Sequence, residues 1–294
     1  MVTSETQLVT LLGNPLKQTF SPQMHNEAFE KSGLDYFYYP TEVESCKLPA
    51  VVEGIRNMRF AGFNITKPYK LEIIKYLDEL DGLARTIGSV NTVVIRDGKL
   101  KGYNTDGEGF VRALFAKTGM DISRQTFLVL GAGGASRAIC STLAFKGARK
   151  IYVMGHNSST KGASLVNDIN SQIKACAELV EGDETSFPQY VRNSTVIVNA
   201  TGVGMEPFPY ETPFKKELLR KELFLIDCCY NPAKTRFLMD GEAVGCECMS
   251  GLGMLIQQGA MAFSLWTGVP GPVDTMTETI RRILGQQARS QQAG

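Results

Sequence analysis

One segment constrains the fold of this chain more than any other, because it combines a buried strand with a glycine-rich turn. The apolar run Thr126–Leu130 leads directly into the sequence GAGGASR at 131–137, and helical spacing then covers Ala138–Lys146. A second apolar strand, Lys150–Met154, follows. Together they form a β-α-β unit of about 30 residues, the size of half a mononucleotide-binding domain. This order predicts a parallel sheet with helices on both faces.

The turn itself has the composition of a phosphate-binding loop. A glycine turn between a strand and a helix presents backbone N–H groups, and the positive end of the helix, to a pyrophosphate. Gly131 permits the tight turn and Gly133 permits close approach of the phosphates, whereas Ser136 takes the third small position. We expect a dinucleotide to contact the turn at Gly131, Ala132, Gly133, Gly134 and Ala135.

The remainder of the chain also alternates between strands and helices, and 294 residues are enough for two domains. Before residue 107 the pattern predicts strands at Thr6–Leu12, Tyr36–Thr41, Phe60–Ile65, Val90–Ile95 and Lys101–Tyr103, and helices at Pro22–Ser32 and Leu71–Leu77. Asp97-Gly98 indicates a hairpin turn. Later residues predict helices at 108–118, 254–266 and 274–285, strands at Thr195–Asn199 and Leu223–Asp227, and a frayed polar tail at Gln286–Gly294.

Composition excludes several classes of protein. The net charge is +1, from 31 Lys and Arg against 30 Asp and Glu, so there is no basic excess for binding nucleic acid. No run of about 18 apolar residues predicts a membrane span, and we expect no secretory signal. Seven cysteines, an odd number, favour free thiols and a cytoplasmic location. The spacing of Cys246 and Cys248 is too short for a zinc knuckle, so no metal site is expected.

Polar residues gather near the ends of strands in the first region. Lys67 and Lys70 follow the strand that ends at Asn64-Ile65-Thr66, and Asn91 and Thr92 interrupt the apolar run that begins at Val90. Asn104 and Asp106 follow the predicted hairpin. Each of them alone fits a turn cap or a solvated side chain. Their joint presence beside a nucleotide-binding unit indicates a functional site.

Eight motifs in the same order give the chain a family resemblance. They are GNPLKQTFSPQMHN (13–26), FNITKPYK (63–70), SVNT (89–92), NTDG (104–107), GAGGASRA (131–138), NATGVGM (199–205), YNP (230–232) and GLGMLIQQGA (251–260). The sequence resembles the shikimate/quinate dehydrogenase family over essentially its whole length. Members of that family interconvert shikimate and 3-dehydroshikimate with NADP, or quinate and 3-dehydroquinate with NAD or NADP.

The resemblance implies an N-terminal α/β substrate domain, residues 1–107, completed by helices in 254–294, and a Rossmann-type cofactor domain at 108–253. The reaction would take place in the cleft between them. Lys70 and Asp106 would be the catalytic pair, and the sequence leaves open which of the two carries the mobile proton. The residues implied for a polyhydroxylated cyclic carboxylate are Thr19 and Ser21 at the carboxylate, and Thr66, Asn91, Tyr230 and Gln258 at the ring hydroxyls.

The same resemblance places further residues against the dinucleotide. Thr201 and Met205 would lie beside its nicotinamide half, Cys228 and Gly251 would approach the amide, and Met254 would pack on the ring. The strand after the glycine turn ends at Gly155, His156, Asn157 and Ser158, with neither an acid for the ribose of NAD nor the arginine clamp for the phosphate of NADP. The absence of a repelling carboxylate favours NADP slightly over NAD.

Two departures from the family pattern leave alternatives open. Thr19 replaces a common serine and adds a methyl group where quinate has an extra hydroxyl, so quinate is the alternative substrate. Lys67 replaces a residue that is commonly apolar.

A catalytically silent dinucleotide sensor and a folate-linked dehydrogenase are further alternatives, although nothing in the sequence marks a pterin pocket. The oligomeric state also stays open, with a homodimer as one candidate.

Overall fold

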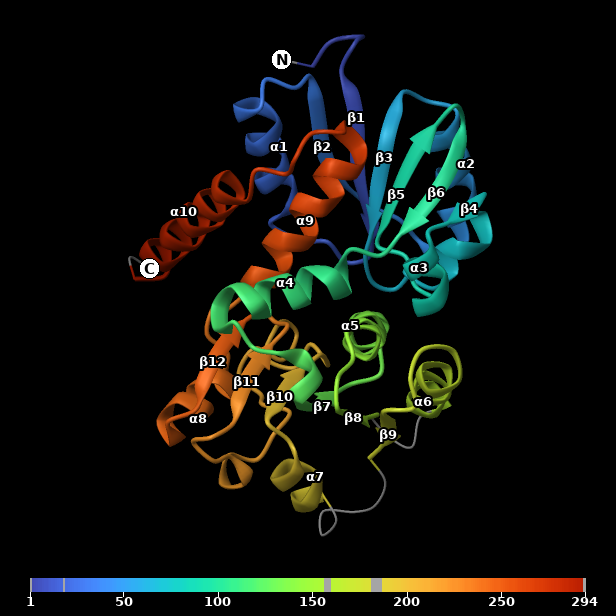
Figure 1. The fold of residues 1–294 in the computed structure, drawn as a ribbon. Helices are drawn as coiled ribbons and strands as arrows, with labels where there is room; N and C mark the ends of the chain where they lie inside the picture. The colour runs from blue at the N-terminus through green and yellow to red at the C-terminus, as the bar shows by residue number, and fades with distance from the viewer. Residues whose placement is uncertain (1, 18, 156–159, 181–186, 293–294) are drawn as a thin grey trace. The chain divides into compact units, whose positions relative to one another are not determined.

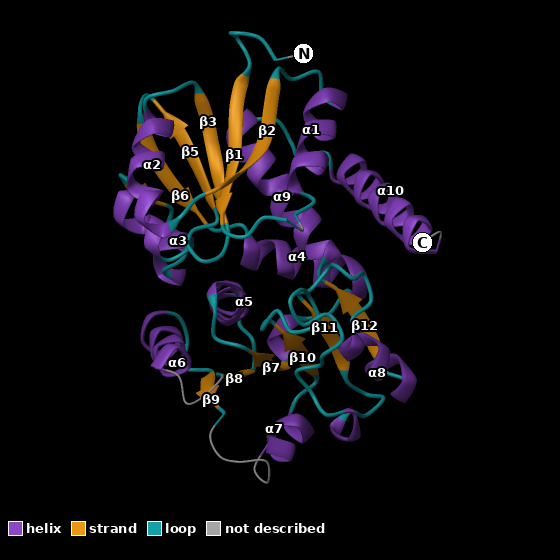
Figure 2. Ribbon diagram, turned by 180° about the vertical axis from the view of Figure 1, so that it is seen from behind, coloured by secondary structure: helices purple, strands orange, loops and turns teal. Residues whose placement is uncertain are grey.

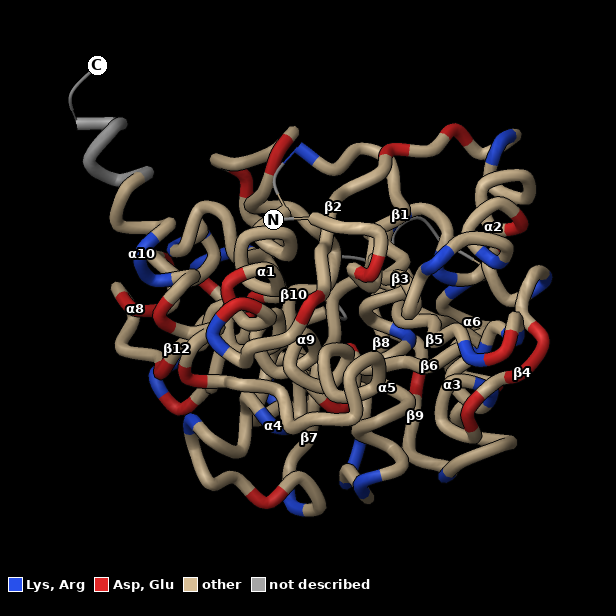
Figure 3. Tube along the Cα trace, turned by 90° about the horizontal axis from the view of Figure 1, so that it is seen from above, with Lys and Arg blue, Asp and Glu red and all other residues tan. Residues whose placement is uncertain are grey.

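A computed structural model describes residues 2–17, 19–155, 160–180 and 187–292 of the chain. The chain divides into two compact units, unit 1 with Met1–Thr105 and Ile256–Gly294, and unit 2 with Asp106–Leu255. Both units combine helices with a six-stranded sheet, which confirms the predicted α/β class (Figure 1). Acidic and basic residues are interspersed along the trace of the chain (Figure 3). Among the described helices, none combines the length and the apolar character needed to cross a bilayer.

The sheet of unit 1 is mixed, with the strand order β2-β1-β3-β5-β6-β4. β1 pairs in parallel with β2 and β3, whereas β3, β5 and β6 pair antiparallel. Asp97 and Gly98 both have positive φ, 50° and 71°, so the predicted two-residue hairpin joins β5 to β6. The strands are β1 (Gln7–Gly13), β2 (Tyr36–Glu42), β3 (Phe60–Ile65), β4 (Glu79–Leu80), β5 (Thr92–Arg96) and β6 (Lys99–Tyr103).

Adjacent residues of β3 show how helices cover both faces of this sheet (Figure 2). Phe63 is fully buried with Val52 and Ile55 of α2. Gly62 faces α9 instead, because a Cβ atom there would lie 2.6 Å from Trp266 Nε1. The helical elements of this unit are α1 (Ser21–Lys31), η1 (Ser45–Lys47), α2 (Leu48–Arg56), η2 (Glu72–Tyr76), α3 (Gly82–Ile87), α9 (Leu252–Thr267), which begins in unit 2, and α10 (Val273–Gln292).

Two predictions about helices in this unit are wrong in detail. The segment expected as a helix at Leu71–Leu77 is the 3₁₀ helix η2, because Leu77 is already extended and leads into β4 after a single short turn. The polar tail from Gln286, expected to be frayed, continues α10 as far as Gln292. That tail is rich in Gln, Ala and Arg, which are good helix formers, and it contains no proline before Gln292.

The sheet of unit 2 is entirely parallel, with the order β12-β11-β10-β7-β8-β9. This is the strand order of a Rossmann fold, in which the order reverses between the first and fourth strands, here β7 and β10. The strands are β7 (Thr126–Leu130), β8 (Lys150–Met154), β9 (Ala177–Leu179), β10 (Val196–Asn199), β11 (Phe224–Asp227) and β12 (Glu247–Ser250). Ligands bind to such sheets at the carboxyl ends of the strands beside this reversal.

Alternate residues of β7 enter two separate apolar cores in unit 2. Phe127 and Val129 pack with α4, α5 and α6, whereas Leu128 and Leu130 pack with α7 and α8. The near-continuous apolar strands that the sequence showed are therefore covered on both faces. The helical elements are α4 (Asp106–Thr118), η3 (Ile122–Arg124), α5 (Gly134–Phe145), α6 (Thr160–Gln172), α7 (Phe187–Asn193), η4 (Lys216–Leu218) and α8 (Arg236–Val244).

Candidate active site

The glycine turn after β7 leaves the N-terminus of α5 open. Gly131 has a φ of +105° and donates its N–H to Met154 O at 2.7 Å, while the buried Ser136 hydroxyl donates to Gly131 O at 2.6 Å. Gly133 is exposed and caps α5, and a Cβ atom there would meet nothing within 4 Å. Because the first N–H groups of α5 face this space, the turn fits a pyrophosphate group.

Other predicted cofactor residues lie around the same turn. A Cβ atom on Gly162, in the first turn of α6, would lie 3.7 Å from Gly155 Cα and 3.9 Å from Ala132 Cβ, so the end of β8 adjoins the glycine turn. His156, Asn157 and Ser158, predicted at the 2′ position of the ribose, lie outside the described residues.

The loops after β10, β11 and β12 continue this edge of the sheet. A Cβ atom on Gly131 would lie 3.0 Å from Ala200 O and 3.3 Å from Thr201 N, which places the loop that carries Thr201 against the glycine turn. Gly251 donates its N–H to Cys229 O at 3.0 Å, and a Cβ atom on Gly251 would lie 2.2 Å from Cys228 O. The structure thus brings three of the predicted loops together at the carboxyl ends of the strands.

Met254 and Tyr230 also belong to unit 2. Met254 is 9% exposed and packs in the apolar core that α4, α5 and α6 form with one face of the sheet. Its contact with a nicotinamide ring stays a prediction. Burial raises the pKa of the Tyr230 phenol to about 12, which keeps it protonated and able to donate a hydrogen bond at neutral pH.

Sequence analysis did not single out two buried polar residues in unit 2. Asn199 and Asp227 are the last residues of β10 and β11, and both are 0% exposed. The Asn199 side-chain N–H donates to Asp227 Oδ1 at 2.9 Å. Their position at the ends of two apolar strands was a visible signal, of the same kind that drew attention to Asn91 and Asp106 in the first region.

In unit 1, the predicted substrate residue Asn91 lies at the centre of a buried polar network. Its Nδ2 donates to Thr105 Oγ1 at 2.9 Å and to Gln258 Oε1 at 3.3 Å, and its Oδ1 accepts the N–H of Thr105 at 2.8 Å. Asn64 fixes the same strand end by donating to Asn91 O at 3.0 Å, and Tyr38 in turn donates to Asn64 Oδ1 at 2.9 Å. The carboxamides of Asn91 and Gln258 are thus side by side and held in defined orientations.

The same strand end anchors the segments that carry the predicted catalytic pair. Lys70 accepts the N–H of Val90 on its backbone carbonyl at 2.9 Å, one residue before Asn91. Asp106 is buried, begins α4 and directly follows Thr105, whose N–H is held by Asn91. The backbone of Lys70 is therefore fixed close to Asn91, and Asp106 is the residue after the one whose N–H Asn91 accepts. The meeting of their side chains stays a prediction.

The segment predicted to bind the carboxylate is linked to the same region of unit 1. Ser21 donates its N–H to Thr19 Oγ1 at 3.2 Å at the start of α1. Upstream, a Cβ atom on Gly13 would lie 2.3 Å from Thr66 Cγ2, so the loop from β1 packs against the end of β3. Lys67, the departure from the family pattern, is exposed.

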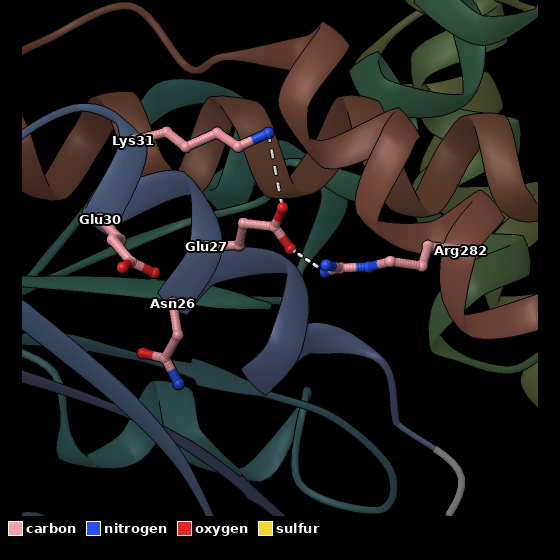
Figure 4. A pocket seen from close by; sticks show the side chains of 5 residues that line it. All are labelled: Asn26, Glu27, Glu30, Lys31 and Arg282. Carbon is pink, nitrogen blue, oxygen red and sulfur yellow. Dashed lines mark hydrogen bonds and ion pairs between the residues drawn. The ribbon is translucent and has the colours of Figure 1, made fainter. Parts of the chain in front are cut away.

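A separate surface hollow contains none of the predicted site residues. It is formed by α1 and α10 and lined by Asn26, Glu27, Glu30, Lys31 and Arg282 (Figure 4). Glu27 forms ion pairs with Lys31 and Arg282. Although desolvation acts to raise the pKa of Glu27, a hydrogen bond to Thr279 and the two cations keep that pKa below its usual value. No three His, Cys, Asp or Glu side chains in the described part of the chain are grouped to hold a metal ion.

Comparisons with known proteins agree with this geometry. The family model described as "Shikimate dehydrogenase substrate binding domain" matches residues 11–93, and "Shikimate 5'-dehydrogenase C-terminal domain" matches 251–281. The chain is 40% identical over 282 residues to the shikimate dehydrogenase (NADP(+)) of Alkaliphilus oremlandii, with 95% of this chain and 98% of that protein covered.

Solved structures extend the comparison to bound ligands. Shikimate 5-dehydrogenase from Listeria monocytogenes, in complex with shikimate and NAD, is 42% identical with a TM-score of 0.87, covering 95% of this chain and 98% of that one. Quinate dehydrogenase from Corynebacterium glutamicum, in complex with NAD, is 30% identical with a TM-score of 0.85, covering 94% and 99%. With the motifs, the two sheets and these similarities in agreement, the chain belongs to the shikimate dehydrogenase family.

Proposed function

We propose that the protein interconverts shikimate and 3-dehydroshikimate with NADP, with Lys70 and Asp106 as its acid–base pair. The observation that carries the proposal is the buried network in which Asn91 holds both Thr105 and Gln258. Membership of the family and the similarity to proteins named shikimate dehydrogenase support the substrate. Seven free cysteines support a reducing compartment, and we therefore place the reaction in the cytoplasm.

The substrate residues suit a ring that carries several hydroxyl groups. Asn91 and Gln258 present carboxamides, which both donate and accept hydrogen bonds, and Thr66 adds a hydroxyl. Thr19 and Ser21, at the start of α1, would donate to the substrate carboxylate. Because such groups are left unpaired by an analogue that lacks a hydroxyl, they discriminate strongly between substrates.

The residues of unit 2 fit a nicotinamide dinucleotide. Gly131 and Gly133 leave the N-terminus of α5 accessible to the pyrophosphate, and Thr201, Met205, Cys228 and Gly251 follow along the same edge of the sheet. A nicotinamide held by these residues would supply or accept the hydride at the carbon that carries the substrate hydroxyl.

Lys70 and Asp106 supply the proton that this exchange requires. In the direction of ketone reduction, the Lys70–Asp106 pair donates a proton to the oxygen as it becomes an alkoxide, and in the reverse direction the pair removes it. An ammonium group also stabilises the negative charge that develops on the oxygen. We assign the mobile proton to the pair and not to either residue alone.

Quinate is the second candidate substrate, and Thr19 is the observation that favours it. The Thr19 methyl group lies in the segment assigned to the carboxylate end of the ring, where quinate and shikimate differ. Similarity to a quinate dehydrogenase is consistent with this candidate.

An assay of shikimate and quinate, each with NAD and NADP, tests both candidates. We expect the highest kcat/KM for shikimate with NADP. Lys70→Ala should lower kcat by at least about 100-fold, the usual contribution of a general acid–base group, with a much smaller change in KM. Lys67→Ala is the matched control, since Lys67 is exposed, and it should leave kcat essentially unchanged. A Lys70→Ala defect confined to KM would remove Lys70 from the chemistry, and no turnover in any of the four reactions would refute the proposal.

A further inference from the structure

Every hydrogen-bonding atom of the Asn199 carboxamide is used within unit 2. Its Oδ1 accepts from Thr201 N at 3.1 Å and from Thr201 Oγ1 at 2.7 Å. Its Nδ2 donates to Val203 O at 2.9 Å and to Asp227 Oδ1 at 2.9 Å. One buried side chain therefore fixes the backbone of the loop after β10 at Thr201 and Val203, and ties that loop to the end of β11.

Asp227 fixes the loop after β11 in the same way. Its Oδ1 also accepts the N–H of Cys229 at 2.9 Å, and its Oδ2 accepts the hydroxyl of Thr235 at 2.6 Å. Desolvation raises the pKa of this carboxyl, while the bonds from Thr235, Cys229 and Asn199 oppose the rise. Burying a carboxyl group between two loops costs free energy, because the group loses its hydration, whereas apolar residues of similar volume would pack there without that loss. Its presence is better explained by the geometry that it imposes.

That geometry concerns the loop that touches the glycine turn. Gly204 has a φ of +104°, and a Cβ atom there would lie 3.2 Å from Thr235 Cβ and 3.8 Å from Asp227 Oδ2. At its other end, the same loop lies against Gly131 through Ala200. Residues 200–204 are thus held between the glycine turn on one side and the Asp227–Thr235 pair on the other.

We propose that Asn199, Asp227 and Thr235 form a polar clamp, a set of positioning residues that sets the place of the 201–205 loop and thereby the affinity for the dinucleotide and the rate of hydride transfer. The inference rests on the proposed function, which puts Thr201 and Met205 beside the nicotinamide. The clamp touches neither substrate nor cofactor. It acts through the loop.

Thr235 offers the sharpest test, because its hydroxyl can be removed at constant volume. Thr235→Val leaves the buried Asp227 Oδ2 without its donor, and the loss of a buried hydrogen bond predicts an increase of about tenfold in the Kd for NADP⁺. Thr235→Ser restores the hydroxyl and should restore the Kd. The matched control is Thr118→Val, which removes a hydroxyl that donates to Leu114 O at 2.8 Å elsewhere in unit 2, and its Kd should be unchanged.

The Kd is measured by calorimetric titration of NADP⁺ into each folded variant, and thermal melts are recorded in parallel. In turnover assays, Thr235→Val should raise the KM for NADP⁺ and lower kcat while the KM for shikimate stays unchanged. Asp227→Asn, which keeps the shape of the side chain but removes its charge, should act in the same direction and serves if Thr235→Val does not fold.

Two results would overturn the clamp. In the first, Thr235→Val folds and binds NADP⁺ with the same Kd as wild type and Thr118→Val, so the network only stabilises the fold. In the second, wild-type protein does not bind NADP⁺ or NAD, so the clamp has no ligand to serve. Wild-type protein that binds NADP⁺ but turns over no substrate would refute the proposed function alone, since the titrations would still test the clamp.

Discussion

Replacing His25 by leucine should change how the stability of unit 1 depends on pH. His25 lies on α1, is 0% exposed, and stacks on Tyr38 with ring centroids 4.7 Å apart. Trp266 packs against it at 5.3 Å. Within the described residues, neither ring nitrogen has a hydrogen-bond partner. Burial among these rings penalises the imidazolium and lowers the pKa of His25 to about 3.

The sign and size of the effect follow from that pKa. An unfolded histidine takes up a proton below about pH 6.5, whereas folded His25 stays neutral down to about pH 3, so protonation favours the unfolded chain across this window. Each pH unit below about 6.5 costs about 1.4 kcal/mol of unfolding free energy. Between about pH 7.5 and about pH 5, His25 alone should therefore remove about 2 kcal/mol from the stability of the wild-type protein.

Urea unfolding followed by fluorescence measures this loss, because the only tryptophan, Trp266, contacts His25 and reports on unit 1. The stability of His25→Leu should fall about 2 kcal/mol less than that of wild type between the two pH values. Above about pH 7.5 the two profiles should run parallel, because both histidine states are then neutral. Parallel profiles over the whole range would show that His25 takes up a proton as readily in the folded protein as in the unfolded chain, contrary to this reasoning.

Four further substitutions have expected outcomes, the last of them as a control. Thr19→Ser, which removes the methyl group taken to favour quinate, should lower kcat/KM for quinate relative to shikimate by about tenfold, the value of a methyl group in a binding site, and an unchanged ratio would place the selecting residue elsewhere. Gly155→Asp should lower kcat/KM with NADP relative to NAD by at least about fivefold, since like charges at about 4 Å repel by about 1 kcal/mol even in water, and an unaltered ratio would place the ribose phosphate away from Gly155. Gly62→Ala should destabilise unit 1 by about 1–3 kcal/mol in urea unfolding, since its Cβ would lie 2.1 Å from Val93 O, whereas Gly54→Ala, whose Cβ meets only Met58 Cε at 3.5 Å, should be neutral or stabilising. Equal stabilities for the two variants would contradict the close approach of Val93 and Trp266 to Gly62.

The sequence predicted the elements whose pattern is local and strong. Phe60–Ile65, Thr126–Leu130 and Lys150–Met154 are strands with the bounds that their apolar runs indicated. Shorter elements such as β9, with three residues, and β12, with four, were not predicted, because so few residues show no distinct period. The segment of η2 is also short, and its apolar spacing fits an α-helix as well as a 3₁₀ helix, so the sequence could not distinguish the two.

The sequence allowed polar residues such as Asn91 to be singled out as site candidates. It did not allow their hydrogen-bond partners to be predicted. Asn91 was singled out because it interrupts an apolar run, but its bond to Gln258 joins residues 167 positions apart. The bond between Asn199 and Asp227 depends in the same way on β10 and β11 lying in register as neighbours. Such pairs arise from tertiary packing. A single sequence shows only that two polar groups end two buried strands.

The division of the chain also has a consequence for its synthesis. Unit 2 is one continuous stretch, whereas unit 1 needs residues 256–294, which are translated after unit 2. The indole N–H of Trp266 donates to Val93 O at 3.0 Å, and the two residues are 173 positions apart. The face of β3 and β5 that Trp266 covers is therefore exposed until all of unit 2 has been translated. A released fragment that ends shortly before residue 256 should therefore contain a folded unit 2 and an exposed apolar sheet, the species on which a chaperone would act.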